Sequence, residues 1–129
     1  MPRTLASNPS TPTATLTALA ADADRDVRCA VARNPNTPPA TLEALAADAH
    51  GFVRCAVGDN PNTPPATLAA LAADADWSVR WAAAGNPSTP ASTLEALARD
   101  DNASVRKEAS ARLAPSSPAN GETIVATGS

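Results

Sequence analysis

Residues 34–59 read NPNTPPATLEALAADAHGFVRCAVGD, and residues 60–85 read NPNTPPATLAALAADADWSVRWAAAG. The two segments agree at most of their 26 positions, with no insertion or deletion between them. The same pattern covers residues 8–33 and 86–111, so the chain carries four copies. A period of this length indicates stacked repeats, each of them too small to bury its own apolar face.

Several residue types recur at the same place in all four copies. Each copy contains an Asn-Pro pair, two leucines three residues apart, an aspartate, and a Val-Arg pair in its second half. Residues that recur in this way are expected to maintain the stacking of one copy on the next. They include Asn8, Asn34, Asn60 and Asn86; Leu16, Leu42, Leu68 and Leu94; Leu19, Leu45, Leu71 and Leu97; Asp22, Asp48, Asp74 and Asp100; and Arg28, Arg54, Arg80 and Arg106.

The first half of a copy predicts a short helix, which in the second copy runs from about Pro38 to Ala47. Thr37 precedes two prolines, and a threonine N-cap followed by proline at the first helical position is a favourable helix start. The two leucines of the copy then share one face of this helix. Thr41 is expected to lie on its exposed side.

The second half of a copy predicts another short helix. Asp24 and Asp76 are suited to cap its N-terminus in the first and third copies, and His50 replaces this aspartate in the second. The helix ends at the next Asn-Pro pair, because asparagine tolerates the left-handed conformation and proline cannot continue a helix. Neither helix is long enough to be stable alone, so stacking must hold both.

The two ends of the repeat array differ from its middle. Residues 1–7 are predicted to form a partial repeat that caps the N-terminus, and residues 8–114 the solenoid itself. In the last copy Glu108 replaces a recurring alanine, which suits a terminal helix that faces water. Residues 115–129 are polar and aperiodic, and we expect them to form a disordered tail.

Composition restricts the function. The net charge is −3, whereas a nucleic-acid-binding protein usually carries a basic patch. No apolar run approaches the ~20 residues that a membrane span needs. The first residues show no signal-peptide segment, so we expect a cytoplasmic protein. Alanine, leucine and valine dominate the apolar residues, which predicts a thin core without a large ligand cavity.

The segment from Asn34 to Asp48, followed by Val53 and Arg54, resembles the leucine-rich repeat variant family of bacteria. The resemblance implies an all-α, right-handed helical solenoid of four two-helix repeats of 26 residues. In this fold an α-helix alternates with a short α- or 3₁₀-helix, in the manner of armadillo and HEAT arrays. Some family members also carry a cysteine-rich N-terminal segment that binds an iron–sulfur cluster, and this chain lacks such a segment.

The recurring arginines allow two interpretations. They could form a row of guanidinium groups for an anionic partner, or each could pair with a recurring aspartate such as Asp22 or Asp48. The one-to-one match between arginines and aspartates favours the structural interpretation, in which the pairs tie adjacent repeats together. A partly buried bidentate pair would contribute more to stability than an exposed one.

We find no residues arranged for catalysis or for binding a cofactor. Cys29 and Cys55 occupy the same repeat position, and two thiols fall short of the four ligands of a typical iron–sulfur cluster. We expect them to be reduced, and to lie either at the surface or half-buried. His50 is the only histidine, and no metal-ligand spacing, nucleophile or phosphate loop accompanies it. The chain is therefore predicted to be no enzyme and to hold no cofactor or metal.

Positions that vary between copies suggest a binding surface. All three aromatic residues occupy such positions, and none lies at a recurring core position. Tryptophan is a preferred anchor at protein interfaces. The alternatives are that these rings cover alanine-rich neighbours, or that the positions have drifted without selection. The stripe of variable residues on the second helices contains the predicted partner-binding residues Arg25, Arg33, Phe52, Trp77, Trp81 and Lys107, together with Cys29, Cys55 and Asp59.

Three functions remain open on the sequence alone. The first is a scaffold that binds a protein partner. The second is an accessory module of a redox or iron–sulfur system, by analogy with relatives that carry a cluster. The third is a HEAT-like protein that binds the backbone of a nucleic acid, against which the acidic composition argues.

Overall fold

The computed structural model describes residues 2–114, and within them the chain forms helices and no strands. This confirms the prediction of an all-α helical solenoid. The helices are α1 (Pro2–Ser7), α2 (Thr13–Leu19), α3 (Arg25–Arg33), α4 (Pro39–Leu45), α5 (Gly51–Asp59), α6 (Pro65–Leu71), α7 (Trp77–Gly85), α8 (Ala91–Leu97) and α9 (Ala103–Leu113). The predicted tail, residues 115–129, lies outside the described residues.

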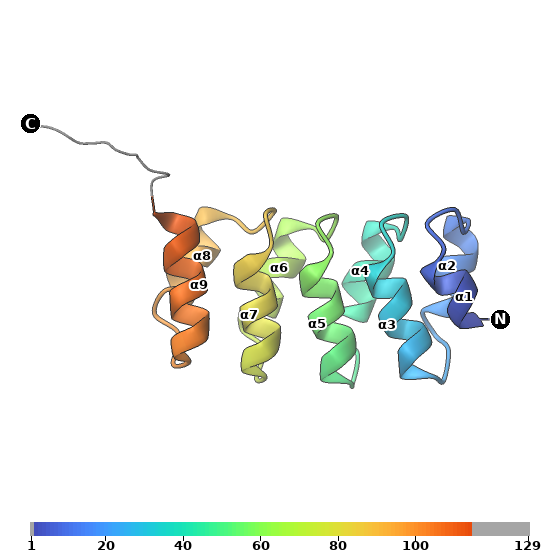
Figure 1. Ribbon diagram of the computed structural model, residues 1–129, viewed down its shortest axis with the longest axis horizontal. Coiled ribbons are helices and arrows are strands. Elements are labelled where there is room, and N and C mark those ends of the chain that lie inside the picture. The colour runs from blue at the N-terminus through green and yellow to red at the C-terminus, as the bar shows by residue number, and fades with distance from the viewer. Residues whose placement is uncertain (1, 115–129) are drawn as a thin grey trace, which may run out of the picture.

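The helices form two layers along the length of the molecule (Figure 1). The odd-numbered helices, which are the second helices of the repeats, stand side by side in the front layer, and each packs against the next. The even-numbered helices lie behind them, and each contacts the second helix of its own repeat. The front layer therefore presents one continuous face built from corresponding positions of successive repeats.

Recurring apolar residues fill the space between the layers. Leu42 and Leu68 are fully buried, as are Val53 and Val79. The second helices approach one another closely because small residues lie between them. At Gly58 a Cβ atom would lie only 2.9 Å from Cβ of Ala82 on the next second helix, so only glycine fits there without a shift.

The second helices begin as predicted. The side chain of Asp24 accepts a hydrogen bond from the backbone N–H of Asp26, and that of Asp76 accepts one from the backbone N–H of Ser78. His50 performs the same task through Nδ1, which lies 3.2 Å from the backbone nitrogen of Phe52. The histidine is thus a substitute cap that preserves the repeat.

The first helices begin one residue later than predicted. Pro38 is itself the N-cap of α4, and it makes no side-chain capping bond. The prediction that Thr37 caps this helix is wrong, because the Thr37 hydroxyl donates to the carbonyl of Val31 at 2.6 Å. The threonine instead supplies a second donor to a carbonyl at the C-terminal end of the preceding helix, which also accepts from the backbone N–H of Asn34 at 3.1 Å.

One further expectation about the helices is made more specific, and another is corrected. The first helices have seven residues each, whereas α3, α5 and α7 have nine. Both helices of a repeat are α-helical, so the second is the short α-helix of the prediction and not a 3₁₀ element, and it is the longer of the two. Thr41 is buried rather than exposed, because its hydroxyl lies 3.0 Å from that of Thr17 on the first helix of the previous repeat.

The recurring asparagines bond one turn to the next, as the sequence suggested. The buried side-chain amide of Asn60 donates to the carbonyls of Ala32 and Asn34, at 2.8 and 3.1 Å, and its oxygen accepts from the backbone N–H of Asn62. Asn86 repeats the same bonds one copy later. Each asparagine therefore donates to two carbonyls near the preceding Asn-Pro turn. The carbonyl of Asn34 also accepts from the backbone N–H of Thr37 at 3.1 Å, whereas that of Ala32 depends on the asparagine side chain.

Candidate interaction surface

The recurring arginines pair with the aspartates of the following repeat. Nε of Arg28 lies 2.8 Å from Oδ1 of Asp48, and Nε of Arg54 lies 2.8 Å from Oδ1 of Asp74. The third pair joins Arg80 to Asp100 at 2.7 Å. A second guanidinium nitrogen reaches the other carboxylate oxygen in each pair, at 3.2 to 3.4 Å. The structural interpretation of the ladder is therefore confirmed for these three arginines.

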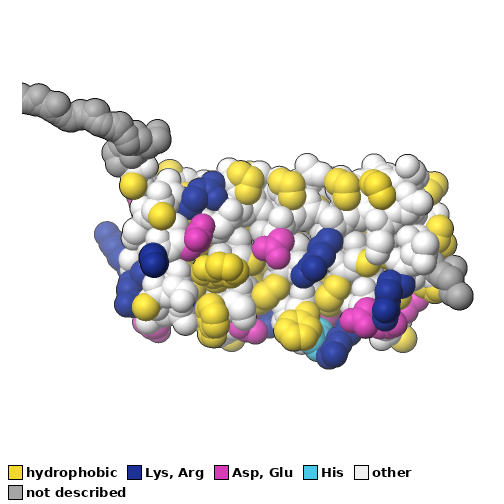
Figure 2. All heavy atoms as spheres, in the orientation of Figure 1, with side chains coloured by type: hydrophobic (Ala, Val, Ile, Leu, Met, Phe, Trp, Pro, Cys, Tyr) yellow, Lys and Arg dark blue, Asp and Glu magenta, His cyan; other side chains and the backbone are white. Residues whose placement is uncertain are grey.

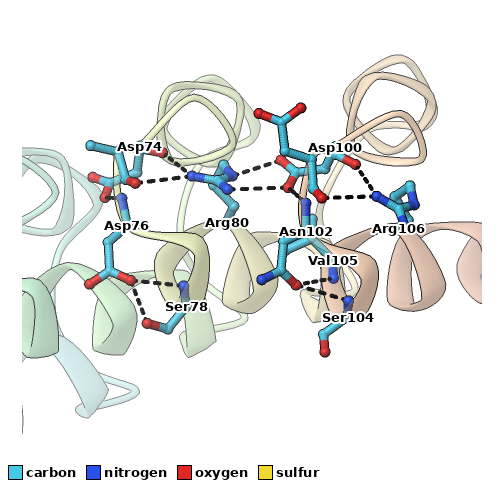
Figure 3. A network of polar contacts seen from close by, with 11 residues as sticks. Asp74, Asp76, Ser78, Arg80, Asp100, Asn102, Ser104, Val105 and Arg106 are labelled. Carbon is cyan, nitrogen blue, oxygen red and sulfur yellow. Dashed lines mark hydrogen bonds and ion pairs between the residues drawn. The ribbon is translucent and has the colours of Figure 1, made fainter.

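Each of these arginines also donates to a backbone carbonyl of its own repeat, as Figure 3 shows for Arg80. Nη1 of Arg80 donates to the backbone carbonyl of Asp74 at 2.7 Å, while the same side chain holds the carboxylate of Asp100. The last arginine, Arg106, donates to the carbonyl of Asp100 in the same way. The guanidinium thus joins the turn before its own helix to the corresponding turn of the next repeat.

Two aspartates of the ladder, Asp48 and Asp100, are held in the charged form. Burial alone would raise the pKa of Asp48, but the hydrogen bonds from Arg28 and from the backbone N–H of His50 outweigh it and lower the pKa below its ordinary value. The same balance lowers the pKa of Asp100, where Arg80 and the backbone N–H of Asn102 donate. These carboxylates are committed to the scaffold and are not available to a ligand.

The variable stripe lies on the exposed face of the front layer (Figure 2). Phe52 is 64% exposed, Trp77 47% and Trp81 45%, which is unusual exposure for large apolar side chains. Figure 2 shows apolar side chains gathered on this face over α5 and α7, with charges of both signs around them. The remaining predicted site residues, Arg25, Arg33 and Lys107, are also exposed.

Phe52 belongs to a small cluster that spans two repeats. The guanidinium carbon of Arg25, on α3, lies 5.7 Å from the centroid of the Phe52 ring, within the range of a cation–π contact. The His50 ring lies 5.0 Å from the same ring, centroid to centroid. The sequence predicted that Arg25 and Phe52 share a face, but it did not predict that His50 joins them.

Trp77 and Trp81 lie one turn apart on α7, and Trp81 forms one wall of a groove. The groove has a volume of about 160 Å³ and lies among α5, α7 and α9. It is lined by Asp59, Trp81, Ala82, Gly85, Asn86, Pro87 and Glu108. Sequence reasoning placed Asp59 on the stripe but assigned Glu108 only to the terminal cap. In the sequence, this role of Glu108 could be inferred only from its replacement of an alanine that recurs in the other copies.

A second groove lies at the other end of the same face, between α1 and α3. It has a volume of about 410 Å³ and includes the stripe residues Cys29 and Arg33. Arg3 and Asp26 also line it, and they are paired with each other at 2.9 Å. The two grooves differ in charge: among residues 2–114, Arg33 forms no ion pair at the first groove, and the carboxylates of Asp59 and Glu108 line the second.

The two thiols are half-buried, which is one of the two locations expected for them. Burial raises the pKa of both Cys29 and Cys55, so each thiol is protonated at neutral pH and is a poor nucleophile or metal ligand. Within residues 2–114, no three side chains of the histidine, cysteine, aspartate and glutamate types are grouped so that they could hold a metal ion. In this part of the chain no helix has the length and apolar character needed to cross a membrane.

The sequence model of the family described as leucine rich repeat variant matches three consecutive segments of the chain, residues 25–50, 51–76 and 77–102. Together these segments cover more than half of the chain. Each matched unit begins at the first residue of a second helix and ends at the N-cap of the next. No curated protein matches the chain.

Proposed function

Because this chain belongs to the leucine rich repeat variant family, we propose that it is a non-enzymatic scaffold for protein–protein interaction. The proposed binding surface is the exposed face of the front layer, centred on Phe52, Trp77 and Trp81. Repeat proteins bind partners across such extended faces, which successive repeats build from corresponding positions. The proposal includes a cytoplasmic location, with which two half-buried thiols are compatible.

The proposal rests on one observation: the recurring apolar residues and the aromatic residues differ in their exposure to solvent. The recurring leucines and valines are buried, whereas all three aromatic rings are about half exposed or more. Rings that served only to cover alanine-rich neighbours would be expected to lie flat and lose most of their exposure. Large apolar side chains that stay exposed together on one face are typical of interaction sites.

The two alternative functions have less support. An iron–sulfur module would need thiolates that are accessible and ionised, whereas burial raises the pKa of Cys29 and Cys55. A protein that binds nucleic-acid backbone would need free arginines, but Arg28, Arg54 and Arg80 are all held by aspartates of the next repeat. The charges left on the front face are of both signs, which fits a protein surface better than a row of phosphates.

Photo-crosslinking in cells of the source organism tests the proposal. The crosslinking amino acid p-benzoylphenylalanine would replace Phe52, whose exposed ring can be exchanged without disturbing the core. We expect a crosslink to one defined protein, and we expect it to disappear when Trp77→Ala and Trp81→Ala are added. Ala69 provides the control position, because it is exposed on α6 in the rear layer.

The result that would contradict the proposal is equally specific. A defined crosslink from position 69, with none from position 52, would place the partner on the first-helix side. The exposed residues Thr17, Glu43, Ala69 and Glu95 would then be the residues to vary.

A further inference from the structure

The groove beside Trp81 combines an aromatic wall with two carboxylates. Asp59 comes from α5 and Glu108 from α9, on opposite sides of α7. The carboxylate of Glu108 lies beside Gly85, since a Cβ atom built there would be 3.6 Å from Oε2. Gly85 also lines the groove and adds no side chain to it, while its carbonyl accepts from Nη1 of Arg112 at 2.7 Å.

Both acids are free of partners among the described residues. Every aspartate of the ladder is held by an arginine or by backbone N–H groups, but within residues 2–114 neither Asp59 nor Glu108 accepts a hydrogen bond or forms an ion pair. Burial raises the pKa of Asp59, and the more distant Arg33 opposes this shift only in part. Asp59 is exposed at the rim of the groove, and the attraction of Arg33 does not cancel the effect of its neighbours on the pKa.

We propose that this groove binds a basic side chain, arginine above all, from the protein partner. A guanidinium group can stack on the indole face while its N–H groups donate to a carboxylate, and both contacts favour the same flat cation. The apolar lining of Ala82 and Pro87 suits the aliphatic stem of that side chain. This inference rests on the proposed function, and it specifies the chemistry of the partner at one end of the stripe.

The other groove on this face indicates which end of the stripe would contact the basic residue of the partner. There Arg33 is exposed, while Arg3 and Asp26 neutralise each other at 2.9 Å. A basic residue of the partner would be repelled at α3 and attracted between α5 and α9. The partner is therefore expected to place its basic residue over α7 and not over α3.

The test uses a small probe whose charge can be removed without changing its shape. The whole chain, labelled with ¹⁵N, is titrated with N-acetyl-arginine N-methylamide and separately with the citrulline analogue. We expect saturable shifts of the Trp81 indole N–H and of the Gly85 amide with the arginine probe. The citrulline probe should bind about tenfold more weakly or worse, because it keeps the planar shape and loses the charge.

Variants of the groove complete the test. Asp59→Asn with Glu108→Gln should weaken binding of the arginine probe by about tenfold, and the same spectra show whether the variant is folded. Glu43→Gln with Asp101→Asn is the matched control, since it makes the same change of charge at exposed positions outside the groove. Equal binding of both probes, or equal loss in both double variants, would overturn the proposal.

The proposed scaffold function and the proposed binding of a basic side chain beside Trp81, called the anchor below, can be wrong independently of each other. If the crosslink at position 52 depends on the tryptophans but is unchanged by Asp59→Asn with Glu108→Gln, the anchor is wrong and the scaffold stands. If the arginine probe binds in a carboxylate-dependent way but no protein crosslinks, the anchor stands and the scaffold function is wrong.

Discussion

Nε of Arg54 donates to Oδ1 of Asp74 at 2.8 Å, and these two residues belong to different repeats. The side chains are only 19% and 13% exposed, so the pair is largely withdrawn from water. Arg54 also donates to the backbone carbonyl of Asp48 in its own repeat, at 2.8 Å. One guanidinium therefore holds two consecutive turns in register.

The first prediction concerns this pair. Arg54→Met keeps most of the apolar stem but leaves the Asp74 carboxylate without its partner, so we expect the free energy of unfolding to fall by about 2–4 kcal/mol. The control is Arg99→Met, at an exposed arginine for which residues 2–114 offer no ion pair, and it should change stability by less than about 0.5 kcal/mol. Urea denaturation measures both. Equal effects would show that the ladder contributes nothing beyond surface charge.

The same ladder predicts how stability depends on pH. Asp48 and Asp100 have lowered pKa values in the folded chain, so their contribution is complete above the unfolded value of about 3.9 and is lost as pH falls through the folded value. We therefore expect the denaturation midpoint to drop below about pH 4. In the variant Asp48→Asn with Asp100→Asn, the denaturation midpoint should be lower at pH 7 and should fall less as the pH is lowered. A midpoint that falls with pH as steeply in the variant as in the wild type would contradict this account.

Because the second helices pack closely, we expect replacement by alanine to lower stability at Gly58 and to raise it at Gly85. Gly58→Ala would place a Cβ atom 2.9 Å from that of Ala82, and the resulting overpacking should cost about 1–3 kcal/mol despite the better helix propensity of alanine. Gly85→Ala meets nothing closer than 3.6 Å and should stabilise by about 0.5 kcal/mol. Thermal unfolding of the two variants compares them directly. Stabilisation by both would mean that neighbouring second helices can move apart freely.

The asparagine ladder can be tested at Asn60. Asn60→Ala removes two donors and leaves the carbonyls of Ala32 and Asn34 without them, so we expect a loss of about 2–4 kcal/mol. Asn36→Ala removes one bond, to the carbonyl of Thr11, from an exposed residue and should cost about 1 kcal/mol or less. Chemical denaturation gives both values. A cost at Asn36 as large as that at Asn60 would contradict the ladder's role.

The sequence predicted most of the scaffold because the scaffold repeats. The 26-residue period located each helix pair, and residue types with one clear role, such as the Asp24 cap, followed from local rules. Thr37 was misassigned because a threonine before proline can serve either the helix that follows or the helix that precedes. The choice depends on how the intervening turn brings the Val31 carbonyl, six residues earlier, to the Thr37 hydroxyl.

The candidate site was predicted less completely, because it depends on contacts between repeats. The sequence placed the aromatic rings outside the recurring core positions but left open whether they are exposed or cover alanine-rich neighbours. The groove beside Trp81 could not be read in the same way, because Asp59 and Glu108 are 49 residues apart and occupy different repeat positions. They share a groove only because α5, α7 and α9 stack in order.

The central claim is that the recurring residues build the scaffold while the exposed tryptophans bind the partner. The most direct test is the dissociation constant of the crosslinked partner for the variant Trp77→Ala with Trp81→Ala. We expect binding to weaken by at least about 2 kcal/mol, the scale of an interface hot spot, while the variant unfolds at nearly the same denaturant concentration as the wild type. A variant that fails to fold would show that the tryptophans are packing residues, and a folded variant with unchanged affinity would show that the partner binds another face.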